Sequence, residues 1–165
     1  MRRATVALLG VLTAACSRVG LSDRVLITAP APSRDVVFVC REVPELDGPG
    51  HVWRLETRDG AELRQLFRGS DGNGRCDAAA WSADGGTLAI VERGSIHVVD
   101  VAWAMTHADE RKTHWFVRQF NYSTTDASLR VGNLHFANAR ELSFDLSGRP
   151  MHLIIPSPLV TGRRT

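Results

Sequence analysis

The sequence predicts an all-β fold, and three observations lead to this prediction. Short apolar runs alternate with turn residues along most of the chain, comparable runs begin at residues 36, 87 and 141, and the same order of runs follows each of these starts. A period of about fifty residues with about four strands per unit is typical of propeller blades. We therefore expect a partial or open β-propeller of about three blade-like, four-stranded units after an N-terminal signal helix.

The first element is the segment that precedes Cys16. Arg2 and Arg3 give it a positive start, residues 4–15 are free of charge and largely apolar, and two alanines stand directly before the cysteine. This order is typical of a secretory signal. The segment resembles a bacterial lipoprotein signal with residues 13–16 as the lipid-attachment box, although Thr13 stands where that family usually has leucine. The resemblance implies a signal peptide over residues 1–15 and lipidation of Cys16 by diacylglyceryl and palmitate-type chains.

An ordinary cleaved signal and a membrane anchor are the alternatives for this segment. About twelve apolar residues span roughly 18 Å as a helix, which is short of the ~30 Å hydrocarbon core. The lipoprotein resemblance instead implies a cell-envelope protein held at the membrane by its lipid. Ser17 implies the periplasmic side of the outer membrane if the envelope is Gram-negative. Residues 16–24 would then form a tether, and residues 25–165 the propeller-like domain.

The first repeating unit follows the tether. An apolar segment ends at Pro30, and three strand-like runs come after it, at residues 36–39, 51–55 and 62–67. β-Branched and aromatic residues are frequent in these runs, whereas Pro, Gly, Asp and Ser separate them. This pattern predicts four strands joined by turns.

The second unit has the clearest pattern. Its first segment ends at Trp81, and the following runs lie at residues 87–90, 97–101 and 114–120. Asp84 and Gly85 stand between the first two strands, and both residue types tolerate the positive φ of a tight hairpin. We therefore expect four strands here too, with residues 102–113 and 121–130 as connecting segments.

Residues 81–90 read Trp-Ser-Ala-Asp-Gly-Gly-Thr-Leu-Ala-Ile, and residues 96–100 read Ile-His-Val-Val-Asp. Together they resemble the TolB-like, WD-repeat-like propeller unit, in which an inner strand ends in Trp-Ser-Pro-Asp-Gly and a third strand reads like Ile-Tyr-Val-Val-Asp. Ala83 replaces the proline and His97 the tyrosine. The resemblance is strong over residues 77–101, fair over 25–67 and weak over 131–156. It implies a propeller blade.

The third unit is incomplete. A segment that ends at Phe136 is followed by runs at residues 141–144 and 152–155, with no fourth run after them. Propellers typically have four to eight blades, so two full units and a partial third leave the ring unfinished. Three explanations remain open at this point: an open stack whose edge pairs with another chain, a small sandwich of the same strands, or a truncated propeller fragment.

The three cysteines divide according to the predicted compartment. If Cys16 carries lipid, Cys40 and Cys76 remain as an even pair in an oxidising space. A disulfide between two neighbouring units is the preferred interpretation, and two buried free thiols are the alternative. Neither cysteine belongs to a Cys-x-x-Cys motif, so a redox-active or metal-binding role is not favoured.

Charge argues against nucleic-acid binding. The chain has 20 Lys and Arg against 18 Asp and Glu, and removal of residues 1–15 would take away Arg2 and Arg3 and no acidic residue. The mature domain would then be formally neutral, without a basic helix face. Such a domain has no field that would gather phosphates.

Catalytic and metal-binding motifs do not emerge from the sequence. His51, His97 and His152 each open the third run of a unit, but that strand lies away from a propeller axis, so we expect half-buried polar side chains and no metal or cofactor. Nucleophile elbows, zinc-binding helices and phosphate-cradling loops do not occur. The chain is therefore not expected to be an enzyme.

These observations predict a non-catalytic, lipid-anchored envelope protein that acts as a protein-binding or scaffolding module. Its expected partners are the membrane, through the lipid, and another protein; binding residues are not identified. The alternative functions are a propeller subunit associated with a separate hydrolase and a truncated propeller fragment. A separate hydrolase would be required because this chain carries no hydrolase motif of its own.

Overall fold

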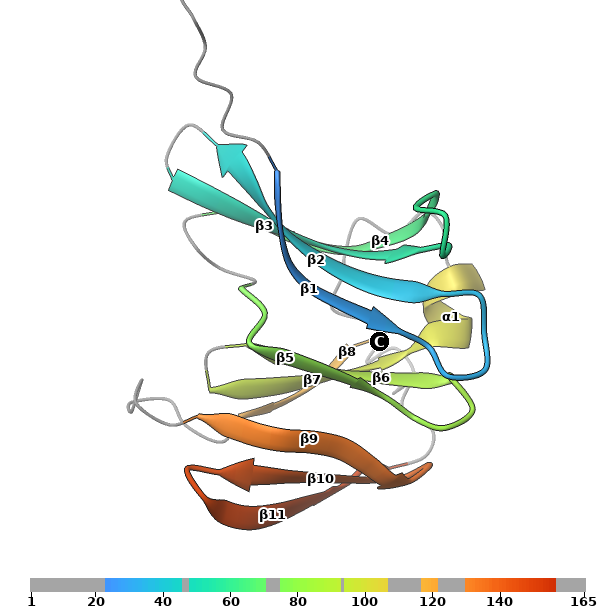
Figure 1. The fold of residues 1–165 in the computed structure, drawn as a ribbon. Coiled ribbons are helices and arrows are strands. Elements are labelled where there is room, and N and C mark those ends of the chain that lie inside the picture. Colours follow the sequence, from blue (N-terminus) through green and yellow to red (C-terminus); the bar gives the residue numbers. More distant parts are fainter. Residues whose placement is uncertain are drawn as a thin grey trace, which may run out of the picture.

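The computed structural model describes residues 23–45, 48–70, 75–92, 94–106, 117–121 and 130–156. The predicted signal peptide, Cys16 and most of the predicted tether lie outside these residues. Within them, the chain forms three antiparallel β-sheets and one short helix (Figure 1). The predicted all-β class is therefore confirmed.

The first sheet holds four strands in chain order. They are β1 (Arg24–Pro30), β2 (Val37–Glu45), β3 (Gly48–Glu56) and β4 (Glu62–Gly69). The turn between β3 and β4 is closed by the Thr57 amide, which donates to the Ala61 carbonyl at 2.8 Å. Gly60 has a φ of 90° in this turn, a conformation that favours glycine. The runs predicted for the first unit correspond to these strands.

The second sheet repeats this order. Its strands are β5 (Ala78–Trp81), β6 (Thr87–Glu92), β7 (Ser95–Asp100) and β8 (Val117–Asn121). One expectation is wrong here, because the predicted connecting segment after β7 begins with helix α1 (Val101–Thr106). The Asp100 carboxylate accepts a hydrogen bond from the Trp103 amide at 3.0 Å and so caps the first turn of the helix. The side chains of Val101 and Ala104 on α1 are buried.

The third sheet has three described strands, which agrees with the incomplete third unit. They are β9 (Val131–Asn138), β10 (Glu141–Leu146) and β11 (Arg149–Ile154), with β10 in the middle. Ser147 and Gly148 join β10 to β11 with φ values of 50° and 82°. Two consecutive positive φ angles correspond to a type I′ turn, whose twist matches that of a hairpin.

The sheets stack face to face, and two apolar cores fill the spaces between them. The core between the first two sheets contains Phe38, Trp53, Leu55, Leu66, Leu88 and Ile90, among others. The core between the second and third sheets contains Ala89, Val91, Ile96, Val98, Leu142 and Phe144, among others. Alternate residues of β6 thus enter opposite cores, because successive side chains of a strand point to opposite faces. The second sheet is apolar on both faces.

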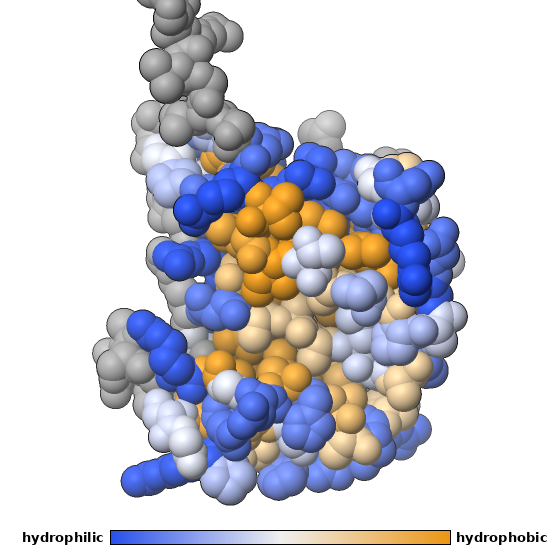
Figure 2. Space-filling model, viewed as in Figure 1, coloured by the Kyte–Doolittle hydropathy of each residue, from blue (hydrophilic) through white to orange (hydrophobic). Residues whose placement is uncertain are grey.

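The first strands of the three sheets lie next to each other, β1 beside β5 and β5 beside β9 (Figure 1). Seen from this side, apolar side chains form a continuous area of the surface over the three strands (Figure 2). Half-buried apolar residues of these strands, including Ile27, Ala79 and Phe136, pack against the two cores. We call the apolar surface over β1, β5 and β9 the apolar strip.

A disulfide joins Cys40 of β2 to Cys76, which precedes β5. The Cα atoms are 6.4 Å apart, the two cysteines are separated by 36 residues, and both lie in the core between the first two sheets. The predicted disulfide between neighbouring units is confirmed. It ties the first sheet to the start of the second.

The turn that carries the family resemblance is held by Ser82 and Asp84. Ser82 Oγ accepts a hydrogen bond from the Thr87 amide at 2.9 Å and donates to Asp84 Oδ1 at 2.6 Å. Asp84 Oδ1 also accepts from the Gly86 amide at 2.9 Å. These two hydrogen bonds, the larger being that from Ser82, lower the pKa of the Asp84 carboxyl. Gly85 takes a φ of 64°, as the sequence predicted for this hairpin.

Candidate functional site

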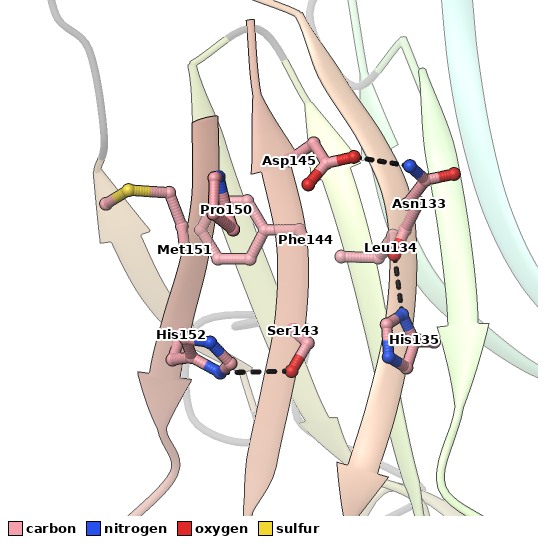
Figure 3. A pocket seen from close by; sticks show the side chains of 9 residues that line it. All are labelled: Asn133, Leu134, His135, Ser143, Phe144, Asp145, Pro150, Met151 and His152. Atoms are coloured by element: carbon pink, nitrogen blue, oxygen red, sulfur yellow. Dashed lines mark hydrogen bonds between the residues drawn. The ribbon is translucent and has the colours of Figure 1, made fainter. Parts of the chain in front are cut away.

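The face of the third sheet that points away from the second sheet carries an open hollow of about 640 Å³ (Figure 3). Its polar side chains come from all three strands. In the register of the sheet, Ser143 of β10 lies opposite His135 of β9 and opposite His152 of β11. This pairing places a His-Ser-His row across the sheet.

On one side of the hollow, Nδ1 of His152 contacts both a serine and a glutamate. His152 Nδ1 lies 3.1 Å from Ser143 Oγ and 3.0 Å from the Glu141 carboxylate. On the other side of the hollow, the Asn133 side chain donates to the Asp145 carboxylate, and His135 Nδ1 lies 2.7 Å from the Asn133 backbone oxygen (Figure 3). Most polar groups of the hollow therefore have a partner within the sheet.

This arrangement does not form a nucleophilic relay. In a Ser-His-acid triad, the hydroxyl and the carboxylate contact opposite nitrogens of the imidazole, so that a proton can pass through the ring. Here Ser143 and Glu141 both face Nδ1 of His152. Ser143 is also 8 % exposed, which restricts access to its hydroxyl. The side chains of Ser143, His152 and Glu141 therefore do not have the geometry of this triad.

A histidine-glutamate contact recurs in all three sheets. Each of the three histidines singled out in the sequence lies on the third strand of its sheet and faces a glutamate on the second strand. The pairs are His51–Glu42 (3.8 Å), His97–Glu92 (3.0 Å) and His152–Glu141 (3.0 Å). The contacts differ in register, because Glu42 lies directly opposite His51, whereas Glu92 lies two positions after the partner of His97 and Glu141 two positions before the partner of His152.

The three histidines differ in burial, so the expectation of half-buried side chains describes only part of the set. The His51 side chain is 2 % exposed, that of His97 is 12 % exposed and that of His152 is 60 % exposed. His97 also meets Trp53 of the neighbouring sheet edge-on, with ring centroids 5.1 Å apart. The three rings thus lie at separate places in the stack, each within 3.8 Å of a different glutamate.

Among the described residues, histidine, cysteine and acidic side chains do not form a group of three that could hold a metal ion. The part of the chain that the structure describes also contains no helix with the length and apolar character needed to cross a membrane. Cys16, the predicted lipidation site, lies outside the described residues. Of the predicted site residues, Cys40 and Cys76 are described and are bonded to each other.

The outward face of the first sheet is covered by cross-strand ion pairs. Arg–Glu contacts link neighbouring or next-neighbouring strands on this face. They are Arg41–Glu56 (3.3 Å), Arg54–Glu62 (3.1 Å) and Arg68–Glu45 (3.0 Å). The Nε atoms of Arg41 and Arg54 are shielded from solvent, so the arginine stems lie flat along the sheet. Both ends of the three-sheet stack therefore present polar faces.

Sequence reasoning missed the polar residues of the hollow. The signal was present in β10, where Glu141, Ser143 and Asp145 alternate with apolar residues and so share one face. Which residues of β9 and β11 would meet them depends on register. A bulge between Ser143 and Asp145 shifts that register, and the sequence did not indicate it.

Comparisons with known proteins establish no family for this chain. No family model matches it, and no curated protein matches it. A solved structure of Hsv2 from Kluyvelomyces marxianus is similar with a TM-score of 0.45 and 18 % sequence identity, over 79 % of this chain and 47 % of that chain. The chain thus spans about half the length of Hsv2. A likeness at this level establishes neither fold nor function.

Proposed function

We propose that this chain is a non-catalytic protein-binding module that a lipid on Cys16 holds at the surface of a membrane in the cell envelope. In this proposal, the three sheets are blades of an open, TolB-like propeller. Three features support the blade arrangement: strands follow each other in chain order within each sheet, the sheets stack face to face, and the first strands are neighbours.

The apolar strip over β1, β5 and β9 carries the proposal (Figure 2). In a closed propeller, the first strands of the blades surround the central axis, where other blades shield them. Here the described residues leave this side facing solvent. Continuous apolar surface on a soluble domain commonly marks a protein-binding site. A partner that presents an apolar surface would cover the strip.

The site geometry supports a binding role over catalysis. In the Ser-His contact of the hollow, the serine and the glutamate share Nδ1 of His152, as described above, and Ser143 is buried. The polar outward faces of the first and third sheets favour contact with solvent over the packing of a further sheet. Binding through the strip therefore fits the open stack best.

The proposed location at a membrane depends on the sequence before Cys16. Its test is the mass of the mature N-terminus in the wild type and in Cys16→Ala. We expect a diacylglyceryl mass on Cys16 in the wild type, and a Cys16→Ala protein that leaves the membrane fraction. An unmodified N-terminus at Met1 would contradict the proposed anchor.

Capture of partners from membranes tests the binding role. The informative variant is Ala80→Lys, because Ala80 is a half-buried residue of β5, the middle of the three strands under the strip. Leu63→Lys is the control, since Leu63 is 37 % exposed on β4, a strand that lies outside the strip. We expect Ala80→Lys to reduce recovery of a cross-linked envelope protein about tenfold and Leu63→Lys to leave it unchanged. Equal recovery with both variants would contradict binding at the strip.

A stoichiometric hydrolase in the wild-type sample would favour the hydrolase-associated alternative.

A further inference from the structure

The third sheet ends in a strand whose second edge pairs with no described strand. In the first two sheets, the corresponding third strands, β3 and β7, are covered by β4 and β8. β11 occupies the same place in the third sheet and has β10 on one side. Its apolar side chains are unusually accessible, with Ile154 at 67 % and Met151 at 40 % exposure.

The register shows which backbone groups of β11 point outward. The Ile155 amide donates to the Arg140 carbonyl at 2.7 Å, so this pair exchanges ladder hydrogen bonds. Because hydrogen-bonded and non-bonded pairs alternate along an antiparallel ladder, the backbone groups of Leu153 and Met151 also face β10. Those of Ile154, His152 and Pro150 therefore face the free edge. The open edge offers the amides of His152 and Ile154 and the carbonyls of all three.

Pro150 limits what this edge can bind. Proline has no amide, and here the missing donor falls on the outward side, which is where sheets accept proline. A long added strand would find no donor at this end of β11. The best match is therefore a strand that accepts hydrogen bonds from the amides of His152 and Ile154 and donates one to the carbonyl of Pro150.

A second copy of β11 meets these requirements. When two such strands run antiparallel about a twofold axis at His152, His152 of each copy exchanges both backbone hydrogen bonds with His152 of the other. The Ile154 amide then donates to the Pro150 carbonyl of the second copy. Because Pro150 has no amide, the Ile154 carbonyl of each copy receives no hydrogen bond in return, and one possible hydrogen bond per copy is missing.

The side chains match in the same register. On the outward face, Ile154 lies opposite Pro150 of the second copy. On the inner face, Met151 lies opposite Leu153 of the second copy, whose side chain already joins the core. Cross-strand apolar pairs of this kind stabilise a sheet. Each of the two most exposed apolar residues of the edge, Ile154 and Met151, is thereby covered.

We propose that two copies of this chain associate through β11, antiparallel and with the twofold axis at His152, and so join their third sheets into one continuous sheet. This inference is independent of the partner proposed for the apolar strip. An edge of six residues forms a small interface, below the ~1,200 Å² of stable complexes, so the association is weak in solution. Confinement to a membrane surface would raise its effective concentration.

Disulfide trapping with the full-length protein in its native membranes tests the register. Residues that form a hydrogen-bonded antiparallel pair have Cα atoms about 5.5 Å apart, which a disulfide can bridge. We expect mild oxidation to convert His152→Cys to a covalent dimer at least tenfold more efficiently than His135→Cys. His135 is a matched control because it is exposed on the same face, on the strand farthest from the edge.

Position 154 provides a second control on the same strand. In the proposed register, two copies of residue 154 are about 13 Å apart along the strands, so Ile154→Cys alone should not cross-link. A mixture of Ile154→Cys with Pro150→Cys should cross-link, because these positions face each other. Dimers from Ile154→Cys alone at the level of His152→Cys would overturn the register.

Loss of the apolar pair should weaken the association. Ile154→Lys, introduced into His152→Cys, is expected to lower the yield of covalent dimer about tenfold, whereas Met105→Lys should leave it unchanged. Met105 is 37 % exposed on α1, away from the third sheet. Circular dichroism of each variant checks that the fold is retained.

Three results would overturn the proposal. One is a yield from His152→Cys no higher than that from His135→Cys. Another is slow hydrogen exchange at the His152 and Ile154 amides in a protein that does not cross-link, because another segment or a different protein then covers the edge. The third is an equal effect of Ile154→Lys and Met105→Lys. None of these results bears on partner capture at the apolar strip.

Discussion

At the scale of single residues, Trp81 links the first two sheets by one hydrogen bond. Its Nε1 donates to the Ala29 carbonyl of β1 at 2.8 Å, and the side chain is largely buried. Trp81→Phe keeps most of the apolar contact and removes the donor. We expect the free energy of unfolding in urea to fall by about 1–2 kcal/mol. A change below ~0.3 kcal/mol would show that this bond does not hold the sheets together.

Asp84 makes stability depend on acid pH. Hydrogen bonds from Ser82 and then from the Gly86 amide lower the pKa of its carboxyl in the folded protein. A lowered folded pKa stabilises the protein above the unfolded pKa of about 4, and this contribution is lost as the pH falls through the folded pKa. We expect Asp84→Ala to cost up to about 1 kcal/mol at pH 7, because solvent screens this exposed carboxylate.

The pH profile supplies the check on Asp84. Urea unfolding of the wild type and Asp84→Ala should differ most near pH 7 and converge below about pH 4. Asp35→Ala is the control, since Asp35 is 72 % exposed and lies 3.7 Å from its ion-pair partner Arg58. A difference that stays constant from pH 7 to pH 3 would contradict the role of the ionised carboxylate.

Both residues show what the sequence could predict at this scale. Asp84 and Gly85 were expected in a hairpin because their backbone preferences are local. The bond from Trp81 to Ala29 joins residues 52 positions apart, so it depends on how two sheets pack. Local chemistry predicted the turn, whereas the link between sheets required the tertiary structure.

At the scale of elements, the β10–β11 turn contains a serine in a backbone conformation that serine seldom adopts. Ser147 adopts a φ of 50°, and type I′ turns favour asparagine followed by glycine. Ser147→Asn retains the backbone bond from residue 147 to Arg130 and should raise the free energy of unfolding by about 0.5–1 kcal/mol. Ser147→Val should lower it, because β-branched residues strain at positive φ. Thermal unfolding of both variants measures this contrast.

The disulfide connects two elements rather than two neighbouring residues. It closes a loop of 36 residues, and a loop of this length predicts about 4 kcal/mol in the chain-entropy account. We expect the double variant Cys40→Ala with Cys76→Ala to lose about 2–4 kcal/mol in urea unfolding. A reductant should destabilise the wild type by a similar amount and leave the double variant unchanged. Equal sensitivity of both proteins to the reductant would contradict this role.

The elements themselves were largely predictable, and helix α1 was the exception. Strand runs were visible because alternating apolar residues and turn residues mark them locally. Helix α1 has only six residues, too few for a helical period to stand out. Asp100 directly before it was the available signal, as a capping residue ahead of an alanine-containing segment.

At the scale of the whole molecule, the second sheet should make the stack unfold as one unit, because it contributes to both cores. Leu142→Ala in the third sheet removes fully buried apolar volume and should cost about 2–4 kcal/mol. Tryptophan fluorescence reports on the first core, where Trp53 and Trp81 lie. We expect the fluorescence and circular dichroism transitions to shift together. A fluorescence transition that stays in place would show that the third sheet unfolds separately.

The hollow on the third sheet could not be predicted from the sequence. His135, Ser143 and His152 meet because the register of three strands and one bulge aligns them. Residue spacing does not encode that alignment, since a shift of one position would send each side chain to the opposite face. By contrast, the three runs that the sequence shows in the third unit correspond to the three strands described in the third sheet.

The double-sided second sheet also governs when folding can start during synthesis. A chain that leaves the ribosome from its N-terminus produces the first sheet early, but the apolar face of that sheet has no surface to pack against until β6 and β7 have emerged. About thirty residues separate the end of β4 from the end of β7, so the ribosome must add them before the first sheet can pack against the second. During that interval, a holding chaperone or a translocation channel would receive an extended chain.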